Sequence, residues 1–348
     1  MSDAARGVRI SIVIVTYNRA EELLRLIDSL ESDLHRSDVE LILVDDGSTD
    51  NTFELLQPKL APIGDRACVL HQEHSGPGTG RNRGIAAARG EIVVFIDTDC
   101  VVHPGWLDTL TAPFDDADVG AVGGPDRSRT DDPPLTRFID YLMTSFLTTG
   151  GVRGATKSRG GSYHPRSFNM AARRDVARDI GGFPVIWYGE DILFSWRIAQ
   201  SKRRLVFAPD AWVYHLRRTK LRAWTRQLYR MGRARWWMGR AYRELLEPVY
   251  AVPLGEWLIG IGALWAAASS GVIGTLGRTV LGVAAAYLVA IGMHSAFKLR
   301  MIASIVAVPF LFLVRESAYA AGSIAGIFSR VPDLRGGLNS ITDTPSDH

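Results

Sequence analysis

The chain has 348 residues, enough for one large domain with an appendage or for two domains. Its two cysteines exclude a disulfide framework and a thiolate metal site, and they indicate a reducing compartment for the half that contains them. The net charge of +3 conceals an uneven distribution: ten Lys or Arg and no acidic residue lie between Arg217 and Arg243, which leaves about −7 for the rest of the chain.

The first ninety residues alternate between short apolar runs and helical patterns. Mostly β-branched residues at 8–15 predict a buried strand, and apolar residues at helical spacing predict a helix over 21–30. A second strand at 39–44 ends in a turn and a helix N-cap, followed by a helix over 53–60. A third strand at 67–71 leads to a Gly-rich turn and a helix over 81–89. Such alternation indicates βαβ units, so we expect an α/β fold with a mainly parallel sheet.

Two aspartates follow a fourth strand, which the five apolar residues at 92–96 predict to be buried on both faces. Ligands of open α/β sheets bind beyond the carboxyl ends of the parallel strands, where Asp97 and Asp99 lie. The two side chains point the same way if the chain is still extended there. Such a pair suits a hard divalent cation, which can neutralise a diphosphate. An isolated D-x-D is more often a cap or a turn, but the surrounding motifs favour the cation.

We expect a helix over 104–110 after the fourth strand. From Asp126 to Tyr163 the pattern is looser, and we expect a helix over 135–148 and a mobile loop at 150–161, which is rich in Gly, Arg and Lys. Glu190 and Asp191 open a helix over 192–199, where acids are also favoured by the helix dipole alone. Short strands at 205–207 and 213–215 follow, and the second ends in His215, which could be a ligand or a structural histidine.

The last 130 residues carry the signals for a membrane. The aromatic and basic segment 217–247 suits an anionic leaflet, and nucleic-acid binding is disfavoured because a hydrophobic segment follows at once. Residues 252–276 and 279–297 approach the ~20 residues that cross a bilayer, and a hairpin would return Lys298 to the cytoplasm. The stretch 301–328, split by Pro309 and an Arg-Glu pair, either crosses or lies in the interface; we expect it to cross.

Both ends of the chain also allow an expectation. The polar residues after 329 are expected to be disordered. The opening residues lack the apolar core of a signal peptide, so we expect the catalytic domain in the cytoplasm and the protein in the cell membrane as a multi-pass chain.

Four motifs, in order, resemble those of the inverting family 2 glycosyltransferases with a GT-A fold. The resemblance covers about residues 8–217. It is carried by the opening strand 11–19, by the turn 44–50 (V-D-D-G-S-T-D) with the loop and helix start at 76–84, by D-T-D at 97–99, and by G-E-D at 189–191. The basic helix followed by a membrane hairpin is similar to the membrane-attached branch that glycosylates lipid-linked acceptors. One departure is that Gln227 and Arg230 are followed by Met231 where processive members carry Q-x-x-R-W. We therefore expect transfer of one or a few sugars.

The resemblance implies how a nucleotide-diphosphate sugar donor would be held. Asp46 would accept hydrogen bonds from its base, with Val15 and Thr16 alongside, and Asp45 would support that turn or reach the ribose. Arg81 would approach the diphosphate or the base.

The resemblance also implies the metal and the base. Asp99 would be the main protein ligand of Mg²⁺ or Mn²⁺, with His215 as a further candidate, and Asp97 would touch the ribose or donor sugar or join the metal. Asp191 would be the general base that deprotonates the acceptor hydroxyl, and Glu190 would steady Asp191 or the acceptor.

The expected organisation has four parts. A GT-A (Rossmann-like) catalytic domain at 1–216 would divide into a nucleotide-sugar half at about 8–120 and an acceptor half at 121–216. Basic amphipathic helices at 217–248, two to three transmembrane helices at 249–328 and a polar tail at 329–348 would follow. The expected acceptor is a lipid-linked or membrane-proximal glycan. Two alternatives stay open: a polyprenyl-phosphate glycosyltransferase, and a non-catalytic membrane scaffold that binds nucleotide sugars.

Overall fold

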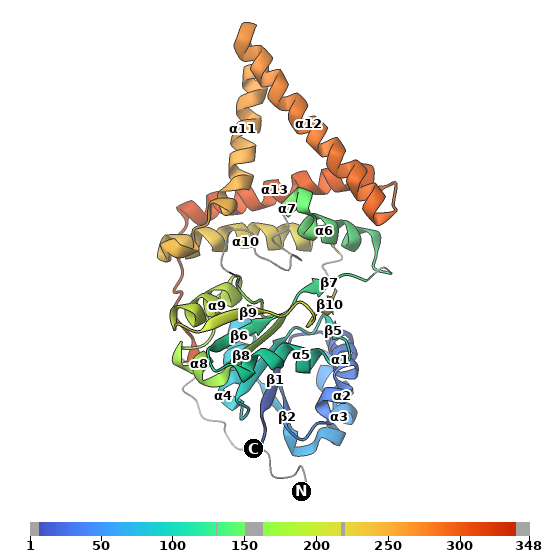
Figure 1. The fold of residues 1–348 in the computed structure, drawn as a ribbon, viewed down its shortest axis with the longest axis vertical. Coiled ribbons are helices and arrows are strands. Elements are labelled where there is room, and N and C mark those ends of the chain that lie inside the picture. The colour runs from blue at the N-terminus through green and yellow to red at the C-terminus, as the bar shows by residue number, and fades with distance from the viewer. Residues whose placement is uncertain (1–6, 130, 150–162, 217–219, 339–348) are drawn as a thin grey trace. The chain divides into compact units, whose positions relative to one another are not determined.

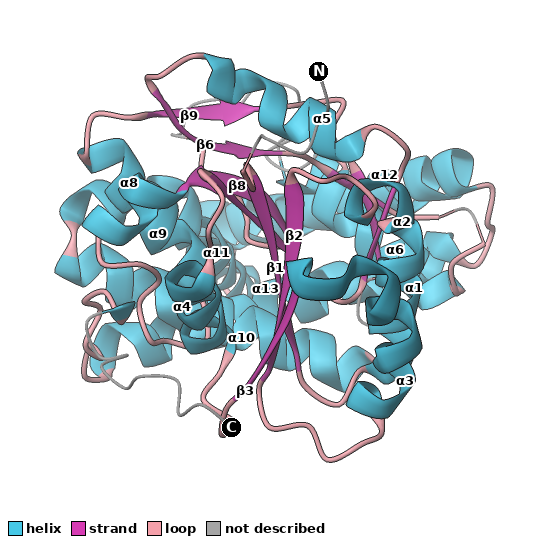
Figure 2. Cartoon of the chain, turned by 90° about the horizontal axis from the view of Figure 1, so that it is seen from below, coloured by secondary structure: helices cyan, strands magenta, loops and turns pink. Residues whose placement is uncertain are grey.

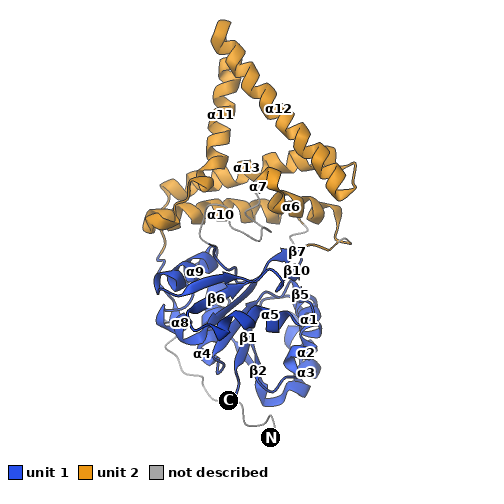
Figure 3. Cartoon of the chain, viewed as in Figure 1, with its two compact units in different colours: residues 1–127, 162–216, 333–348 blue, residues 128–161, 217–332 orange. Residues whose placement is uncertain are grey.

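The computed structural model describes residues 7–129, 131–149, 163–216 and 220–338 (Figure 1). The chain divides into two compact units (Figure 3). Unit 1 comprises Met1–Arg127, Ser162–Leu216 and Asp333–His348, and unit 2 comprises Ser128–Gly161 and Arg217–Pro332. The expected loop at 150–161, with its basic side chains, lies outside the described residues.

A seven-stranded sheet lies at the centre of unit 1, in the order β3-β2-β1-β4-β8-β6-β9. Neighbouring strands among the first four in this order pair in parallel, as do β6 and β9, whereas β8 is antiparallel to both of its neighbours. The mainly parallel α/β sheet confirms the expected fold class. The strands are β1 (Ile10–Thr16), β2 (Val39–Asp45), β3 (Ala67–His71), β4 (Ile92–Ile96), β6 (Val119–Gly123), β8 (Asn169–Arg173) and β9 (Arg204–Phe207).

Helices cover both faces of this sheet, which explains why its strands are apolar without interruption. Side chains alternate along β1, so that Ile12 joins the core on one face and Val13 the core on the other. Figure 2 shows the two layers. One layer has α1 (Ala20–Ser29), α2 (Glu31–Leu34), α3 (Thr52–Leu60) and α5 (Trp106–Thr111), and the other has α4 (Pro77–Ala87), α8 (Arg174–Asp179) and α9 (Glu190–Gln200). Short 3₁₀ helices follow α3 at Ala61–Arg66 and α5 at Ala112–Asp115.

A second, three-stranded sheet brings distant segments of unit 1 together. Its central strand is β10 (Val213–His215), which pairs antiparallel with β5 (Cys100–Val102) and parallel with β7 (Asp126–Arg127). The register places His215 opposite Cys100, one residue beyond Asp99. Local pattern predicts the strand at 213–215, but its partners come from segments about a hundred residues earlier.

Residues 333–338, which we call the C-terminal strap, pack on unit 1. Gly336 forms a β-bridge with Pro184, the Gly337 amide donates to the Phe183 carbonyl at 3.0 Å, and Leu338 donates to Gly181 at 3.0 Å. Leu334 is buried. The expectation of disorder after residue 329 is therefore wrong for residues up to 338, because an apolar side chain and backbone hydrogen bonds anchor a segment whose composition is otherwise polar; residues 339–348 lie outside the described chain.

Unit 2 is helical in the part of it that the structure describes. Its helices are α6 (Pro134–Thr144), α7 (Phe146–Thr149), α10 (Leu221–Ala241), α11 (Val252–Ala267), α12 (Gly271–Leu299) and α13 (Ser304–Phe328), with 3₁₀ turns at Arg243–Leu245 and Pro248–Ala251. The single helix expected at 135–148 is interrupted at Ser145, whose ψ of 139° is extended. Three helical segments, at Pro248–Ala267, Gly271–Leu299 and Ser304–Phe328, are long and apolar enough to cross a membrane.

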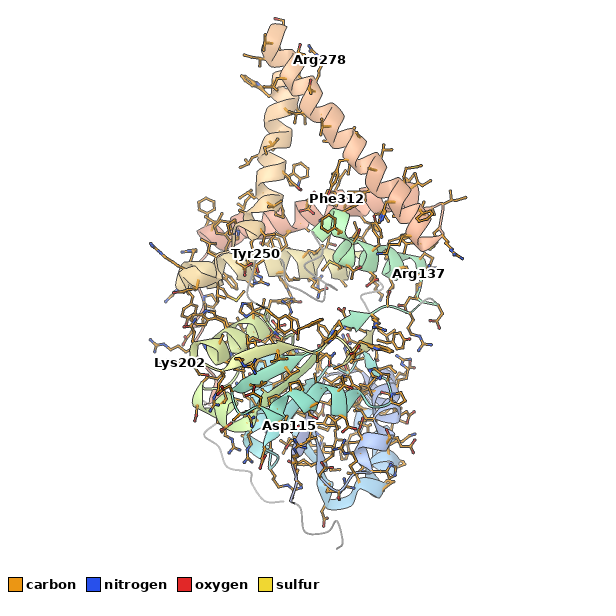
Figure 4. The ribbon with its side chains drawn as sticks, in the orientation of Figure 1. Asp115, Arg137, Lys202, Tyr250, Arg278 and Phe312 are labelled. Carbon is orange, nitrogen blue, oxygen red and sulfur yellow. The ribbon has the colours of Figure 1, made fainter. Side chains whose placement is uncertain are left out.

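The turn of the expected hairpin lies earlier than the sequence suggests. Arg278 was expected between two spans, but α11 ends at Ala267 and α12 already begins at Gly271 (Figure 4). Arg278 lies two turns into α12, and its Nη1 donates to the Ala267 carbonyl at 3.1 Å. A cation need not mark a loop when it can satisfy a free carbonyl at the end of the neighbouring helix.

Candidate active site

Polar side chains gather in unit 1 at the carboxyl ends of the parallel strands. Asp45 is the last residue of β2, Asp97 and Asp99 follow β4, and Glu190 and Asp191 form the first turn of α9. Arg81 lies on α4, and His215 ends β10. The fold therefore brings residues from five different elements to one edge of the sheet, where ligands of open α/β sheets bind.

Asp46 organises the loop at 72–76. One carboxylate oxygen accepts hydrogen bonds from Gln72 Nε2 at 2.6 Å and the Ser75 amide at 2.9 Å, and the other accepts from the Gly76 amide at 3.0 Å. The residue is 2% exposed. Both of its oxygens accept hydrogen bonds from the loop, and the expected contact of Asp46 with a nucleobase stays a prediction.

Three further residues, Asp45, Val15 and Thr16, were expected beside the donor. Asp45 accepts from the Ser48 amide at 3.0 Å and lies 3.1 Å from His71 Nδ1. Val15 packs so closely on α4 that a Cβ at Gly80 would be 2.6 Å from it. Thr16 is buried, and its Oγ1 has no hydrogen-bond partner among the described residues.

Three aromatic side chains form a cluster beside this loop, which the sequence did not predict. Tyr17 stacks on His74 with ring centroids 3.8 Å apart, and His74 meets the edge of Trp187 at 5.3 Å. Tyr17 is 39% and Trp187 54% exposed. Exposed rings of this kind offer flat surfaces for a base or a sugar ring. No local pattern predicts this contact, because it joins segments that are far apart in the chain.

Arg81 bridges two of the predicted carboxylates. Its Nη2 lies 2.8 Å from Asp97 Oδ1 and its Nη1 lies 3.1 Å from Glu190 Oε1, while only 6% of the side chain is exposed. Burial, together with the negative charge of Asp191, raises the pKa of Glu190 to about 7, although Arg81 opposes this shift. Arg81 thus links α4 to the start of α9, and its expected approach to the diphosphate or the base stays a prediction.

Asp191 has a partner that sequence reasoning missed. Arg166 Nε lies 2.9 Å from Asp191 Oδ2, and Asp191 Oδ1 accepts the Ile192 amide at 2.9 Å. About 13% of the Asp191 side chain is exposed. The ion pair with Arg166 fixes the orientation of the Asp191 carboxylate. No motif contains Arg166, so only the tertiary contact identifies it.

Asp99 and His215 lie beside each other, whereas Asp97 pairs with Arg81. Asp99 Oδ1 lies 3.2 Å from His215 Nε2, Asp99 Oδ2 accepts from Arg19 Nη1 at 3.0 Å, and His215 Nδ1 is 3.6 Å from Asp126 Oδ2. Burial acts to raise the pKa of Asp99, but His215 and Arg19 outweigh it and hold that pKa well below its usual range. Burial acts to lower the pKa of His215, but Asp99 and Asp126 raise it to about 10.

This group can be tested as a cation site. Donor atoms of Asp99, Cys100 and His215 lie within 4.8 Å of one another. Burial, together with the negative charges of Asp99 and Asp97, raises the pKa of the Cys100 thiol well above its usual value, which favours the neutral thiol over the thiolate that binds metals. The buried Asp99 Oδ1 makes no well-aligned hydrogen bond within the described chain. A carboxylate with a free lone pair beside an imidazole fits Mn²⁺ or Mg²⁺, provided that His215 first loses a proton.

Comparisons with known proteins point to one family. The family model described as "Glycosyl transferase family 2" matches residues 11–181. A pre-mycofactocin glycosyltransferase of Mycobacterium tuberculosis is 31% identical over 218 residues, which are 62% of this chain and 44% of that protein. An uncharacterized glycosyltransferase of Nostoc sp. is 38% identical over 189 residues, which are 51% of this chain and 54% of that protein. The chain thus spans about half the length of these curated relatives.

A solved structure shares the fold over nearly the whole chain. It is the mannosyltransferase PcManGT from Pyrobaculum calidifontis in complex with GDP-Man and Mn²⁺. The two proteins are 18% identical with a TM-score of 0.66, and the likeness covers 94% of this chain and 89% of the mannosyltransferase.

Proposed function

This chain belongs to glycosyl transferase family 2 through its residues 11–181, and from that premise we propose that it moves a sugar, with inversion, from a nucleotide-diphosphate donor to a lipid-linked or membrane-proximal glycan acceptor. The observation that carries the proposal is the meeting of Asp99 with His215 and of Arg81 with Glu190 at the carboxyl edge of one parallel sheet. Charged side chains on both sides of a reacting sugar suit the transfer of that sugar from a diphosphate.

Asp99 and His215 would hold a divalent cation beside the donor's diphosphate. That cation, when bound, would neutralise the charge that builds on the leaving nucleoside diphosphate. Arg19 holds Asp99 from the other side, and 31% of its side chain is exposed, so it is placed to add positive potential there. The solved mannosyltransferase with the same fold is in complex with GDP-Man and Mn²⁺, a donor and a metal of the classes proposed here.

Asp191 would take the proton of the attacking acceptor hydroxyl. Arg166 orients its carboxylate, and Arg81 fixes the neighbouring Glu190 against Asp97. The hydroxyl oxygen then forms a bond to the anomeric carbon as the bond to the diphosphate breaks, and its proton goes to Asp191. Displacement in one step from the opposite face of the sugar inverts the anomeric centre.

Two alternatives have less support. The basic side chains that would bind a polyprenyl phosphate, at 153, 157 and 159, lie outside the described residues, so that acceptor remains the second candidate. A non-catalytic scaffold predicts damage to the carboxylate set, yet Asp46, Asp97, Asp99 and Asp191 are all present.

The test uses detergent-purified full-length protein and a panel of nucleotide sugars, with and without Mn²⁺, in the presence of membrane lipid extract. We expect one donor to be consumed only with metal. Asp99→Asn should abolish consumption, and Asp191→Asn should bind donor normally while turnover falls roughly 10²- to 10⁴-fold. Asp28→Asn, at an exposed surface carboxylate, is the matched control and should behave as wild type. Tight donor binding with no consumption by the wild type would instead support the scaffold.

A further inference from the structure

The C-terminal half of α13 lies alongside α10, and the two helices run in parallel. A Cβ at Gly322 would be 2.0 Å from the Tyr229 carbonyl oxygen, and one at Gly326 would be 2.6 Å from the Arg233 carbonyl oxygen. Further along, Trp237 Nε1 donates to Ser329 Oγ at 2.7 Å. The contacts advance together along both chains, so the helices stay side by side through this whole stretch, as Figure 1 also shows. Whatever environment holds one of them also holds the other.

α10 is not suited to the interior of a bilayer. It carries six arginines in 21 residues, at positions 222, 226, 230, 233, 235 and 240. An arginine at the centre of a membrane helix is strongly unfavourable, and here they occur along the whole length. Arg222 and Arg226 are exposed, as expected for side chains that reach anionic headgroups.

The chain path gives an independent argument. α13 ends at Phe328, and the C-terminal strap, which begins five residues later, is hydrogen-bonded to Gly181 and Phe183 of unit 1. Five residues reach at most about 17 Å, which is less than the ~30 Å of a hydrocarbon core. The start of α10 is likewise only five residues from Leu216 of unit 1. The chain between these points must leave and re-enter the same side of a membrane, so it crosses an even number of times.

The face of α13 that turns away from its neighbours is apolar. Its exposed side chains recur at helical spacing: Val306, Phe310, Leu313, Ile324 and Phe328. The opposite face buries Glu316, which pairs with Arg315, and Arg315 donates to the carbonyls of Leu142 at 2.7 Å and Thr148 at 2.8 Å. An apolar stripe beside a basic helix is typical of elements that lie in the membrane interface.

From these observations we propose that α13 does not cross the bilayer. Together with α10 it forms an interfacial platform on an anionic leaflet, on the same side as unit 1, and α11 and α12 form a hairpin that alone crosses. The proposal rests on the membrane attachment in the proposed function, and it reverses the expectation that residues 301–328 cross.

The test is side-specific labelling of full-length protein in sealed membrane vesicles of both orientations. Cysteine replaces, one position at a time, Ser270 at the hairpin turn, Lys298 before α13 and Arg330 after it, all of which are exposed. The background is Cys68→Ala, in which the remaining Cys100 is buried. A membrane-impermeant maleimide should label Lys298→Cys and Arg330→Cys from the same side, and Ser270→Cys from the opposite side. Labelling of Lys298→Cys and Arg330→Cys from opposite sides would overturn the proposal, because α13 would then cross.

The labelling needs no enzymatic activity, so its result is separate from the test of the proposed function. Donor consumption by Ser270→Cys, measured in the same vesicles, shows whether a topology result belongs to an active enzyme. Release of the wild-type chain from membranes by alkaline carbonate would show that no helix is inserted, and it would overturn the hairpin as well.

Discussion

Arg81 shows how single residues determine this site. Its buried guanidinium is hydrogen-bonded to Asp97 at one end and lies 3.1 Å from Glu190 at the other, so one side chain sets the distance between strand β4 and the first turn of α9. Only a planar, forked cation reaches two carboxylates at once with fixed geometry.

Arg81→Lys should therefore lower turnover by roughly 10- to 100-fold while the charge is kept, because a single ammonium group cannot hold both carboxylates in place. The matched control is Arg83→Lys, two residues along the same helix, where the guanidinium donates to the His71 carbonyl in an exposed hydrogen bond. Steady-state kinetics, with the donor that the panel of nucleotide sugars selects, would measure both. Equal turnover rates for the two variants would show that Arg81 does not position α9.

Asp33 gives a prediction about pH that is independent of the site. It is 6% exposed in α2, and burial raises its pKa to about 6, with Asp108 adding to the shift and Arg36 opposing it. The folded state therefore holds this proton more tightly than the unfolded state, whose Asp pKa is near 3.9. Stability is lost as the pH rises from about 4 through about 6, because the unfolded chain releases the proton first.

Asp33→Asn removes the ionisable group and with it the loss of stability at higher pH, and the amide has nearly the same shape as the carboxyl group. The variant should match the wild type at pH 4 and be more stable at pH 7.5 by about 1–2 kcal/mol. Thermal unfolding at the two pH values would measure the difference, with Asp28→Asn as an exposed control on α1. A stability difference of the same size at both pH values would contradict the assignment.

Among the elements, the C-terminal strap and α9 support each other. The strap holds the Phe183 carbonyl, Phe183 stacks on Phe194 of α9 with ring centroids 3.9 Å apart, and Arg197 of α9 donates to the Leu334 carbonyl. Asn82 of α4 holds both backbone groups of Phe183, at 2.7 and 2.9 Å. The position of Asp191 at the start of α9 thus depends on a segment from the far end of the chain.

Gly336→Ala should disturb this arrangement, because a Cβ there would lie 2.4 Å from the Gly181 carbonyl oxygen. We expect a loss of about 1–3 kcal/mol of stability and a lower kcat with unchanged affinity for the donor, since the strap acts on α9 and not on the sheet edge where the donor is proposed to bind. Gly260→Ala, where the Cβ meets nothing within 4 Å, is the control. A change in donor affinity alone, with kcat intact, would contradict this role.

At the scale of the whole molecule, the two units are interleaved along the chain. Unit 1 is assembled from three segments and unit 2 from two. Both segments of unit 2 are therefore joined to unit 1 at each end. This connectivity restricts how many times the apolar helices can cross a membrane. The even number of crossings follows from this connectivity and needs no information about how the units are oriented.

The sequence by itself determined the parallel sheet, because strands that are buried on both faces must be apolar throughout, and it placed Asp97, Asp99, Glu190 and Asp191 at the ends of elements. It also located the three apolar segments. Composition could not decide whether 301–328 crosses, since the same residues suit a span and an interface.

Only the tertiary structure decided the partners of these groups. Arg166, Asp126 and the C-terminal strap reach the site from segments that no local pattern connects to it, and Asp46 and Arg81 turn out to hold protein groups. The physical reason is that a buried charge takes the nearest available partner in space, and that neighbour is set by packing between segments far apart in the chain.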